Sequence, residues 1–170
     1  LIAQDTSRYG IDLYGEYSLA KLMERLCKID GLHWLRVLYC YPDSITDELL
    51  EVMAREEKIV PYIDLPLQHA SGKILKAMNR RGDRQSLTAL MKKIREKVPG
   101  VVLRTTLIAG FPGETEEDFT ELAEFVKDVK FERMGCFAYS QEEGTAAAEL
   151  PDQVEDETKE RRAEILMDDQ

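Results

Sequence analysis

Strand-like runs alternate with helix-like segments along the whole chain. Five short runs are rich in aliphatic and β-branched residues, and the segments between them place apolar residues every three or four positions. The runs cover residues 1–5, 34–41, 60–67, 101–109 and 134–140. Successive βαβ units favour a parallel sheet with right-handed crossovers. The pattern predicts an α/β fold, either an open doubly wound sheet or a barrel or partial barrel.

Capping residues mark where the helices are expected to begin. Polar side chains that favour the N-cap position precede the apolar periodicity, and they are Ser18, Thr46, Ser71, Asp83 and Thr115. Three acidic residues follow Thr115, where they suit the helix dipole. We expect one domain over residues 1–150 and a charged helical tail over residues 151–170 that leads out of this domain to a further C-terminal domain.

Composition narrows the class of protein. The formal net charge is −10, which argues against an extended nucleic-acid-binding surface. No apolar run approaches the roughly 18 residues of a membrane span, and we expect a cytoplasmic protein. Cys27, Cys40 and Cys136 lack the paired spacing of metal sites, so we expect buried free thiols and no metal ligands in this chain.

The carboxyl ends of the predicted strands carry polar and glycine residues. Both candidate architectures bind ligands at these ends. The residues there include Gln4 and Asp5, then Gln68 and His69, and then the segment 110–114. Gly110 and Gly113 allow either a tight turn that binds nothing or close approach of a ligand to the main chain. From the residues alone we predict a cleft for a small, partly polar and partly flat molecule.

Two side chains at these ends have alternative interpretations. His69 is either a general acid or base or a residue that hydrogen-bonds a loop. Asp5 is either a base or ligand, or a turn and cap residue. One hypothesis is therefore a cofactor-independent α/β-barrel enzyme acting on a sugar or phosphate ester, with these two residues as acid and base. Another is a noncatalytic docking module.

Five segments together resemble the radical S-adenosylmethionine methylthiotransferases. These are residues 4–15, 38–42, 64–71, 78–81 and 109–115. Within this family they are similar to the RimO type, which modifies an aspartate of small-subunit ribosomal protein number twelve. The Gln-Asp-Thr segment at residues 4–6 and the Gln-His-Ala-Ser segment at residues 68–71 favour this type over the relative that modifies transfer RNA.

The resemblance implies a partial (β/α) TIM-like barrel of six βα units, of which this chain supplies the last five. It also implies S-adenosylmethionine and two 4Fe-4S clusters as cofactors, with the cluster cysteines outside this chain. In the family, a radical from S-adenosylmethionine removes hydrogen from the β-carbon of the target aspartate, which then receives a methylthio group. We expect the isolated chain to be inactive and to assemble no cluster.

The resemblance also assigns cofactor-binding positions, and no catalytic residue. Ile108 and Gly110 match the segment that packs against adenine, with Phe111 beside it. Gln68 and His69 match a strand end near the ribose or the methionine moiety. We expect a bulky side chain at Gly110 to enter the cofactor contact without disturbing the core.

Three further positions lie outside that group. Gln4 and Asp5 match a strand end on the cofactor or substrate side. Arg104 is a charge within an apolar strand, and it points either toward the cofactor's carboxylate or into an ion pair with a buried acid such as Asp64. If residues 1–5 form an uncovered strand edge, we expect self-association through them.

Overall fold

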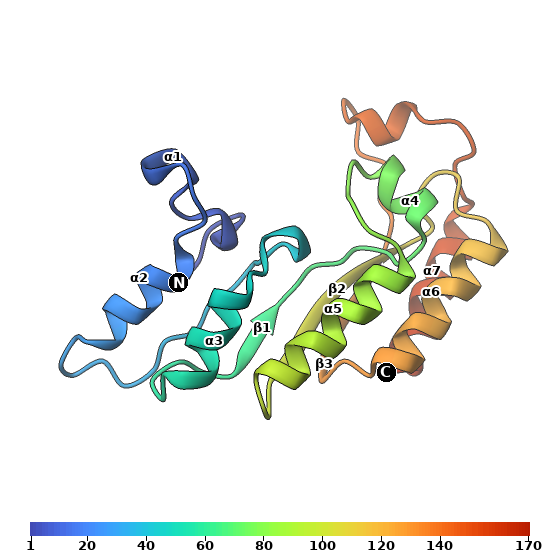
Figure 1. The fold of residues 1–170 in the computed structure, drawn as a ribbon. Coiled ribbons are helices and arrows are strands. Elements are labelled where there is room, and N and C mark those ends of the chain that lie inside the picture. Colours follow the sequence, from blue (N-terminus) through green and yellow to red (C-terminus); the bar gives the residue numbers. More distant parts are fainter. The chain divides into compact units, whose positions relative to one another are not determined.

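The computed structural model describes residues 1–170, and the chain divides into two compact units. Unit 1 consists of Leu1–Pro66 and Leu90–Arg104, and unit 2 consists of Leu67–Ala89 and Thr105–Gln170. Three strands form one sheet in the order β1-β2-β3 (Figure 1). They are β1 (Tyr62–Asp64), β2 (Val102–Ala109) and β3 (Arg133–Ala138).

β2 contributes to both units. In unit 1 it runs parallel to β1, with Tyr62 opposite Val102 and Asp64 opposite Arg104. In unit 2 the carbonyl of Ala109 accepts a hydrogen bond of 2.9 Å from the backbone N–H of Tyr139, just after β3. Alternate residues along β2 are buried and half-exposed. One side of the strand therefore packs into the protein while the other remains accessible.

Two predicted strands are wrong in detail. Residues 1–5 and 34–41 are extended segments with isolated hydrogen bonds instead of regular strands. The N–H of Leu38 donates to the carbonyl of Leu1, and the N–H of Thr6 donates to Tyr39. Residues 1–4 are exposed, so no apolar packing holds this segment in a continuous ladder.

The predicted strand over 60–67 is also shorter than expected. Only Tyr62–Asp64 is regular, and pairing resumes at a single bridge between Gln68 and Leu107. Gln68 has a φ of 70°, in the left-handed region that extended strands do not use. This backbone conformation turns the chain at the bridge between Gln68 and Leu107.

Unit 1 contains two longer helices, α2 (Leu19–Cys27) and α3 (Asp47–Arg55), and shorter turns of helix. The short ones are η1 (Thr6–Arg8), α1 (Ile11–Tyr14) and η2 (Pro42–Ser44). Thr46 caps α3 as predicted, since its hydroxyl accepts the N–H of Leu49 at 3.1 Å. Ser18 precedes α2, but its hydroxyl donates to the carbonyl of Glu16 instead of capping.

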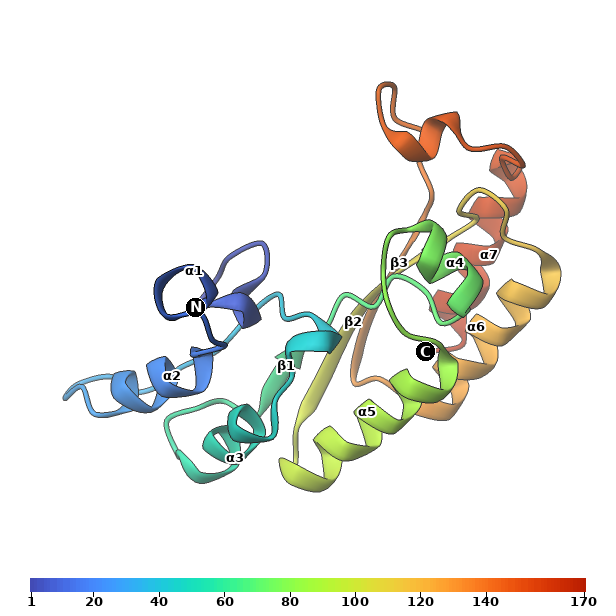
Figure 2. The ribbon, with the colours of Figure 1, turned by 45° about the horizontal axis from the view of Figure 1, so that its top comes forward.

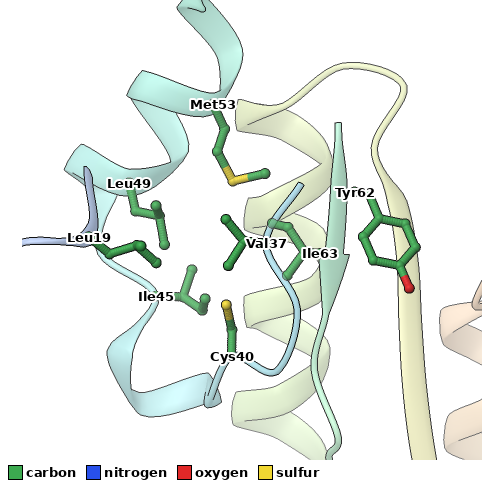
Figure 3. Close-up of a pocket in the computed structure, with 8 residues that line it drawn as sticks. All are labelled: Leu19, Val37, Cys40, Ile45, Leu49, Met53, Tyr62 and Ile63. Carbon is green, nitrogen blue, oxygen red and sulfur yellow. The ribbon is translucent and has the colours of Figure 1, made fainter. Parts of the chain in front are cut away.

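The core of unit 1 surrounds a narrow apolar pocket (Figure 3). Side chains from α2, α3, β1 and the segment 34–41 converge on it. Ile63 points into this group, whereas Tyr62, the preceding residue of β1, points to the opposite side of the strand (Figure 3). The lining is apolar except for Cys40 and Tyr62, and Tyr62 points away, so we interpret the pocket as imperfect core packing.

Unit 2 contains α4 (Gly72–Ala77), α6 (Glu116–Val129), η3 (Ala146–Glu149) and α7 (Asp156–Asp168), and α5 (Arg84–Lys97) begins in it. Thr115 caps α6 as predicted, and Asp118 completes a capping box with it. Figure 2 shows α7 beside α6, and α7 also contacts β3. The charged tail forms the helix α7, and this helix packs within unit 2.

Candidate functional site

The turn between β2 and α6 is built on two glycines with positive φ. Gly110 has a φ of 74° and Gly113 a φ of 81°, and both values favour glycine strongly. A Cβ on Gly113 would meet open space, but a Cβ on Gly110 would lie 2.1 Å from Cγ of Lys159. The expectation that a bulky residue at Gly110 spares the core is therefore wrong, because α7 already fills that space.

A buried carboxylate holds this turn in place. Oε2 of Glu114 accepts the backbone N–H of Gly110 at 2.9 Å and lies 3.1 Å from Nε2 of His69. Oε1 of Glu114 accepts Nη1 of Arg162 at 2.8 Å. The side chains of His69 and Glu114 are fully buried. An anion in such surroundings is stable only when it is paired and hydrogen-bonded, as here.

Hydrogen bonding also fixes the tautomer of His69. Its Nδ1 accepts the backbone N–H of Ser71 at 2.9 Å, so the proton of the neutral ring resides on Nε2 and is donated to Glu114. Both ring nitrogens are thus used inside the fold. The structure therefore agrees with the interpretation of His69 as a residue that hydrogen-bonds loops.

A second buried carboxylate joins α4 to α6. Asp118 accepts the hydroxyl of Ser71 and the ammonium of Lys73, each at 2.7 Å, and the N–H of Thr115 at 3.0 Å. Burial opposes its charge, but the hydrogen bonds from Lys73, Ser71 and Thr115 outweigh burial and lower the pKa of Asp118. Lys73 also donates to the carbonyl of Gly113. The turn is therefore fixed from both sides.

Gln68 combines an unusual backbone with an unused polar atom. Its N–H donates to the carbonyl of Thr106, and its carbonyl accepts the N–H of Ile108 at 2.8 Å. The side-chain Oε1 is buried and has no hydrogen-bond partner. Such an acceptor is costly unless something pairs with it. Gln68 therefore has both the strain and the free polar atom that are typical of a binding site.

An aromatic contact lies next to the turn. The rings of Phe111 and Tyr139 meet edge to face, with centroids 5.3 Å apart. Phe111 is buried, and Ile108 is half-exposed on β2. The structure therefore brings together five of the eight predicted cofactor-binding residues within unit 2, namely Gln68, His69, Ile108, Gly110 and Phe111.

The other three predicted residues belong to unit 1. Asp5 accepts the hydroxyl of Ser7, whose oxygen in turn accepts the N–H of Tyr41 at 3.0 Å. Asp5 also occupies the position before η1, which agrees with its turn interpretation. Gln4 is exposed and helps line an open hollow beside Tyr39 and Tyr41.

Arg104 forms an ion pair with Asp64. Its Nη1 lies 2.9 Å from Oδ1 of Asp64, whose side chain is buried while that of Arg104 is partly exposed. The hydrogen bond that Arg104 donates to Asp64 raises the pKa of Arg104. Of the two alternatives predicted for Arg104, the structure shows the ion pair with Asp64.

Comparison with known proteins identifies the family. The model of the Radical SAM superfamily matches residues 11–126, which is more than half of the chain. The chain belongs to the radical SAM superfamily. The resemblance that we inferred from the five sequence segments is confirmed.

The similar curated proteins share one name. The chain is 56% identical over 162 residues to "Ribosomal protein uS12 methylthiotransferase RimO" of Desulforamulus reducens, covering 95% of this chain and 36% of that protein. It is 52% identical to the protein of the same name from Clostridium tetani, covering 98% of this chain and 38% of that protein. The chain thus spans little more than a third of the length of these relatives.

Solved structures of radical SAM enzymes share the fold. Coproporphyrinogen III oxidase (HemN) of Escherichia coli matches with a TM-score of 0.66 and 19% identity over 89% of this chain and 36% of that chain. The methyltransferase TsrM of Kitasatospora setae matches with a TM-score of 0.58 and 16% identity over 79% of this chain and 26% of that chain. The predicted fold class, an α/β partial barrel of the radical SAM type, is confirmed.

Radical SAM enzymes use S-adenosylmethionine and a 4Fe-4S cluster, and the residues of this chain fit the first of these. The unpaired Oε1 of Gln68 suits a hydroxyl or amino donor, and Ile108 offers half-exposed apolar surface on β2. The cluster does not fit these residues, because no group of three or more His, Cys, Asp or Glu side chains is arranged to hold a metal.

All three cysteines carry free thiols. Cys27 and Cys40 are buried as predicted, and Cys136 is half-buried. Burial raises the pKa of Cys40 to about 12 and that of Cys136 to about 12. These thiols stay protonated at neutral pH, whereas metal binding needs thiolates. Separately, no helix has the length and apolar character needed to cross a lipid bilayer.

Sequence reasoning missed the two residues of α7 that complete the site. Lys159 and Arg162 lie in the segment that we predicted to be a charged helical tail, and we assigned no role to either residue. Both are buried. The one available signal was spacing, since Arg162 lies four residues before the buried Leu166 and so shares its helix face.

Proposed function

We propose that this chain is the S-adenosylmethionine-binding core of a RimO-type methylthiotransferase. The observation that carries the proposal is 56% identity, over 95% of the chain, to a protein of that name. Because the chain spans only 36% of that relative, the activity is proposed for the whole protein. The substrate would be ribosomal protein uS12, and the product an aspartate with a methylthio group on its β-carbon.

The chemistry comes from the cofactors, and the residues of this chain provide the environment. When bound, S-adenosylmethionine and the clusters supply the radical, the sulfur and the methyl group. The protein must hold the cofactor rigidly and exclude other hydrogen donors. A turn held by a buried carboxylate and a capped helix is suited to that task, because its backbone has little freedom to move.

We assign adenine contact to Ile108, Gly110 and Phe111, and contact with the ribose or the methionine moiety to Gln68. The support is the half-exposed position of Ile108 and the unpaired Oε1 of Gln68. His69 is assigned an indirect role, because both of its ring nitrogens are engaged within the protein.

Gln4, Asp5 and Arg104 stay predictions as cofactor or substrate contacts. The partly exposed side chain of Arg104 is compatible with a second partner in addition to Asp64. The rival hypothesis of His69 and Asp5 as an acid and base pair is disfavoured, because His69 is fully buried. No observation specifically favours a noncatalytic docking module.

The partners follow from this function. A ribosomal protein substrate would place the enzyme in the cytoplasm. With a net charge of −10, this chain is not expected to bind nucleic acid directly. We also infer self-association of the isolated chain through the exposed apolar residues Leu1 and Ile2.

The test is product formation by the whole protein. The protein is reconstituted anaerobically with iron and sulfide and incubated with S-adenosylmethionine, a reductant and uS12. Mass spectrometry of the digested uS12 should locate one methylthio group on a single aspartate. Transfer RNA serves as the competing substrate, and a methylthio group on transfer RNA with none on uS12 would overturn the assignment of substrate.

A further inference from the structure

Helix α7 places two buried basic side chains against the turn from Gly110 to Glu114. Lys159 and Arg162 are 6% and 5% exposed, although lysine and arginine are almost never buried without partners. They lie three residues apart and so share one helix face. The neighbouring Arg161 is exposed. Only the inward-facing arginine of the adjacent pair therefore contacts the turn.

Arg162 contacts both the turn and the start of α6. Its Nη1 donates to Oε1 of Glu114 at 2.8 Å and to the backbone carbonyl of Glu114 at 3.3 Å. Its Nη2 donates to Oε2 of Glu116 at 2.9 Å. The guanidinium lies 5.2 Å from the centre of the Phe119 ring. These contacts use the fixed, planar geometry of arginine, which lysine cannot reproduce.

Lys159 packs against the same turn at Gly110. Its Cγ lies where a side chain on Gly110 would begin, so the alkyl chain packs directly against the glycine. Its ammonium pairs with Asp156 at 2.6 Å and lies 5.6 Å from the centre of the Tyr139 ring. The long stem thus contributes packing while the charge is satisfied elsewhere.

Glu114 links these contacts to the turn. One carboxylate oxygen receives Arg162, and the other receives both the N–H of Gly110 and Nε2 of His69. Without Arg162, Glu114 would be a buried charge with no positive partner. An unpaired buried charge is strongly unfavourable, so the carboxylate would move toward water. That movement would weaken its hydrogen bond to the N–H of Gly110.

We propose that Arg162, supported by Lys159, is a positioning residue that sets the conformation of the turn from Gly110 to Glu114 for cofactor binding. It acts through Glu114 and does not touch the cofactor. The inference rests on the proposed function, in which this turn contacts adenine.

The test compares Arg162→Met with Arg161→Met in the whole protein. Both variants remove one arginine charge from adjacent positions of α7, but only the first removes the partner of Glu114. The first measurement is hydrogen exchange of the Gly110 amide in the absence of cofactor. We expect exchange about tenfold faster in Arg162→Met, because the protecting hydrogen bond opens more often.

The second measurement is the affinity for S-adenosylmethionine, determined by calorimetry on the reconstituted protein. We expect the Kd to rise by about tenfold in Arg162→Met and to stay unchanged in Arg161→Met. Arg162→Lys restores a charge without the two-point geometry, so both quantities should fall between those of the wild type and Arg162→Met. If Arg162→Met does not fold, Arg162→Lys takes its place. Its Gly110 exchange rate and its Kd are then compared with those of Arg161→Met, and the same outcomes support or overturn the proposal.

Gly110 exchange in Arg162→Met equal to that in Arg161→Met would overturn the positioning role. An unchanged Kd despite faster exchange would also overturn it, since the turn would then be loosened without consequence for the cofactor. A wild-type protein that binds no S-adenosylmethionine would instead refute the proposed function. The exchange comparison needs no cofactor, so the two failures are distinguishable.

Discussion

His69 and Glu114 are 45 residues apart in the sequence and share a hydrogen bond of 3.1 Å between two fully buried side chains. One follows the bridge at Gln68, and the other ends the turn after β2. The bond therefore couples the conformations of two loops that both carry predicted cofactor contacts. A buried hydrogen bond to a charged group is also expensive to break, because Nε2–H of His69 would be left buried without an acceptor.

Replacement of His69 by alanine should destabilise the protein markedly. The change leaves the N–H of Ser71 without an acceptor and removes a donor from Glu114. We expect a loss of about 2–4 kcal/mol in the free energy of unfolding, measured by urea denaturation. His33→Ala is the matched control, since His33 is exposed. Similar losses in the two variants would contradict this structural role.

Asp118 should stabilise the protein in a pH-dependent way. Its pKa is lowered from the usual 3.8 in the folded state. The stabilisation is therefore complete above pH 3.8 and is lost as the pH falls below that value toward the folded pKa. We expect Asp118→Asn to cost about 1–3 kcal/mol at pH 7.

The cost of Asp118→Asn should shrink in strongly acidic solution. Urea denaturation at several pH values below and above the usual pKa gives the measurement. Asp12→Asn is the control, because Asp12 is an exposed residue of α1. A cost for Asp118→Asn that is the same at every pH would mean that the charge of Asp118 contributes nothing.

The two glycines of the turn should differ in their tolerance of alanine. Gly113→Ala meets open space and adds only the strain of a positive φ, about 1–2 kcal/mol. Gly110→Ala adds the same strain, and its Cβ also lies 3.1 Å from the backbone Cα of Lys159 and closer still to its side chain. We expect the larger loss of thermal stability at Gly110. Equal losses would show that Lys159 of α7 can shift to accommodate the added Cβ at little cost.

Local chemistry made part of this structure predictable. Thr46 and Thr115 start helices because their hydroxyls accept nearby N–H groups, and both contacts lie within three residues. The glycine turn was likewise predictable, since Gly110 and Gly113 take the positive φ values that their residue type favours. Resemblance in short segments supplied the superfamily, which periodicity alone did not distinguish from other α/β folds.

Contacts between distant residues were not predictable. Arg162 and Glu114 are 48 residues apart, and nothing local separates the buried Arg162 from the exposed Arg161 beside it. The sequence also left both alternatives for Arg104 open, because an ion pair with Asp64 depends on the register between β1 and β2. The irregular segment 34–41 contains strand-forming residues, but its hydrogen bonds depend on partners far away in the sequence.

The isolated chain should assemble no iron–sulfur cluster. Its three cysteines are not grouped, and burial keeps the pKa of Cys40 at about 12. After anaerobic treatment with iron and sulfide, iron analysis and absorption spectra should show no stoichiometric cluster. About four irons per chain would contradict this expectation.

In a parallel experiment, the thiol of Cys40 should react with iodoacetamide far more slowly in the folded protein than in urea.

Apolar residues near the amino end should promote self-association of the isolated chain. Ile2 is 70% exposed and Leu1 38% exposed, and both lie in an extended segment that forms only scattered hydrogen bonds. An uncovered extended backbone with apolar side chains favours pairing with a second copy. We expect sedimentation velocity to show dimers or larger species at high concentration, and Ile2→Lys to shift the population toward monomer. Leu13→Lys is the control, because Leu13 is 61% exposed on α1, outside this segment. If the wild-type chain stays monomeric at high concentration, or if Leu13→Lys dissociates it as effectively, the extended segment is not the site of association.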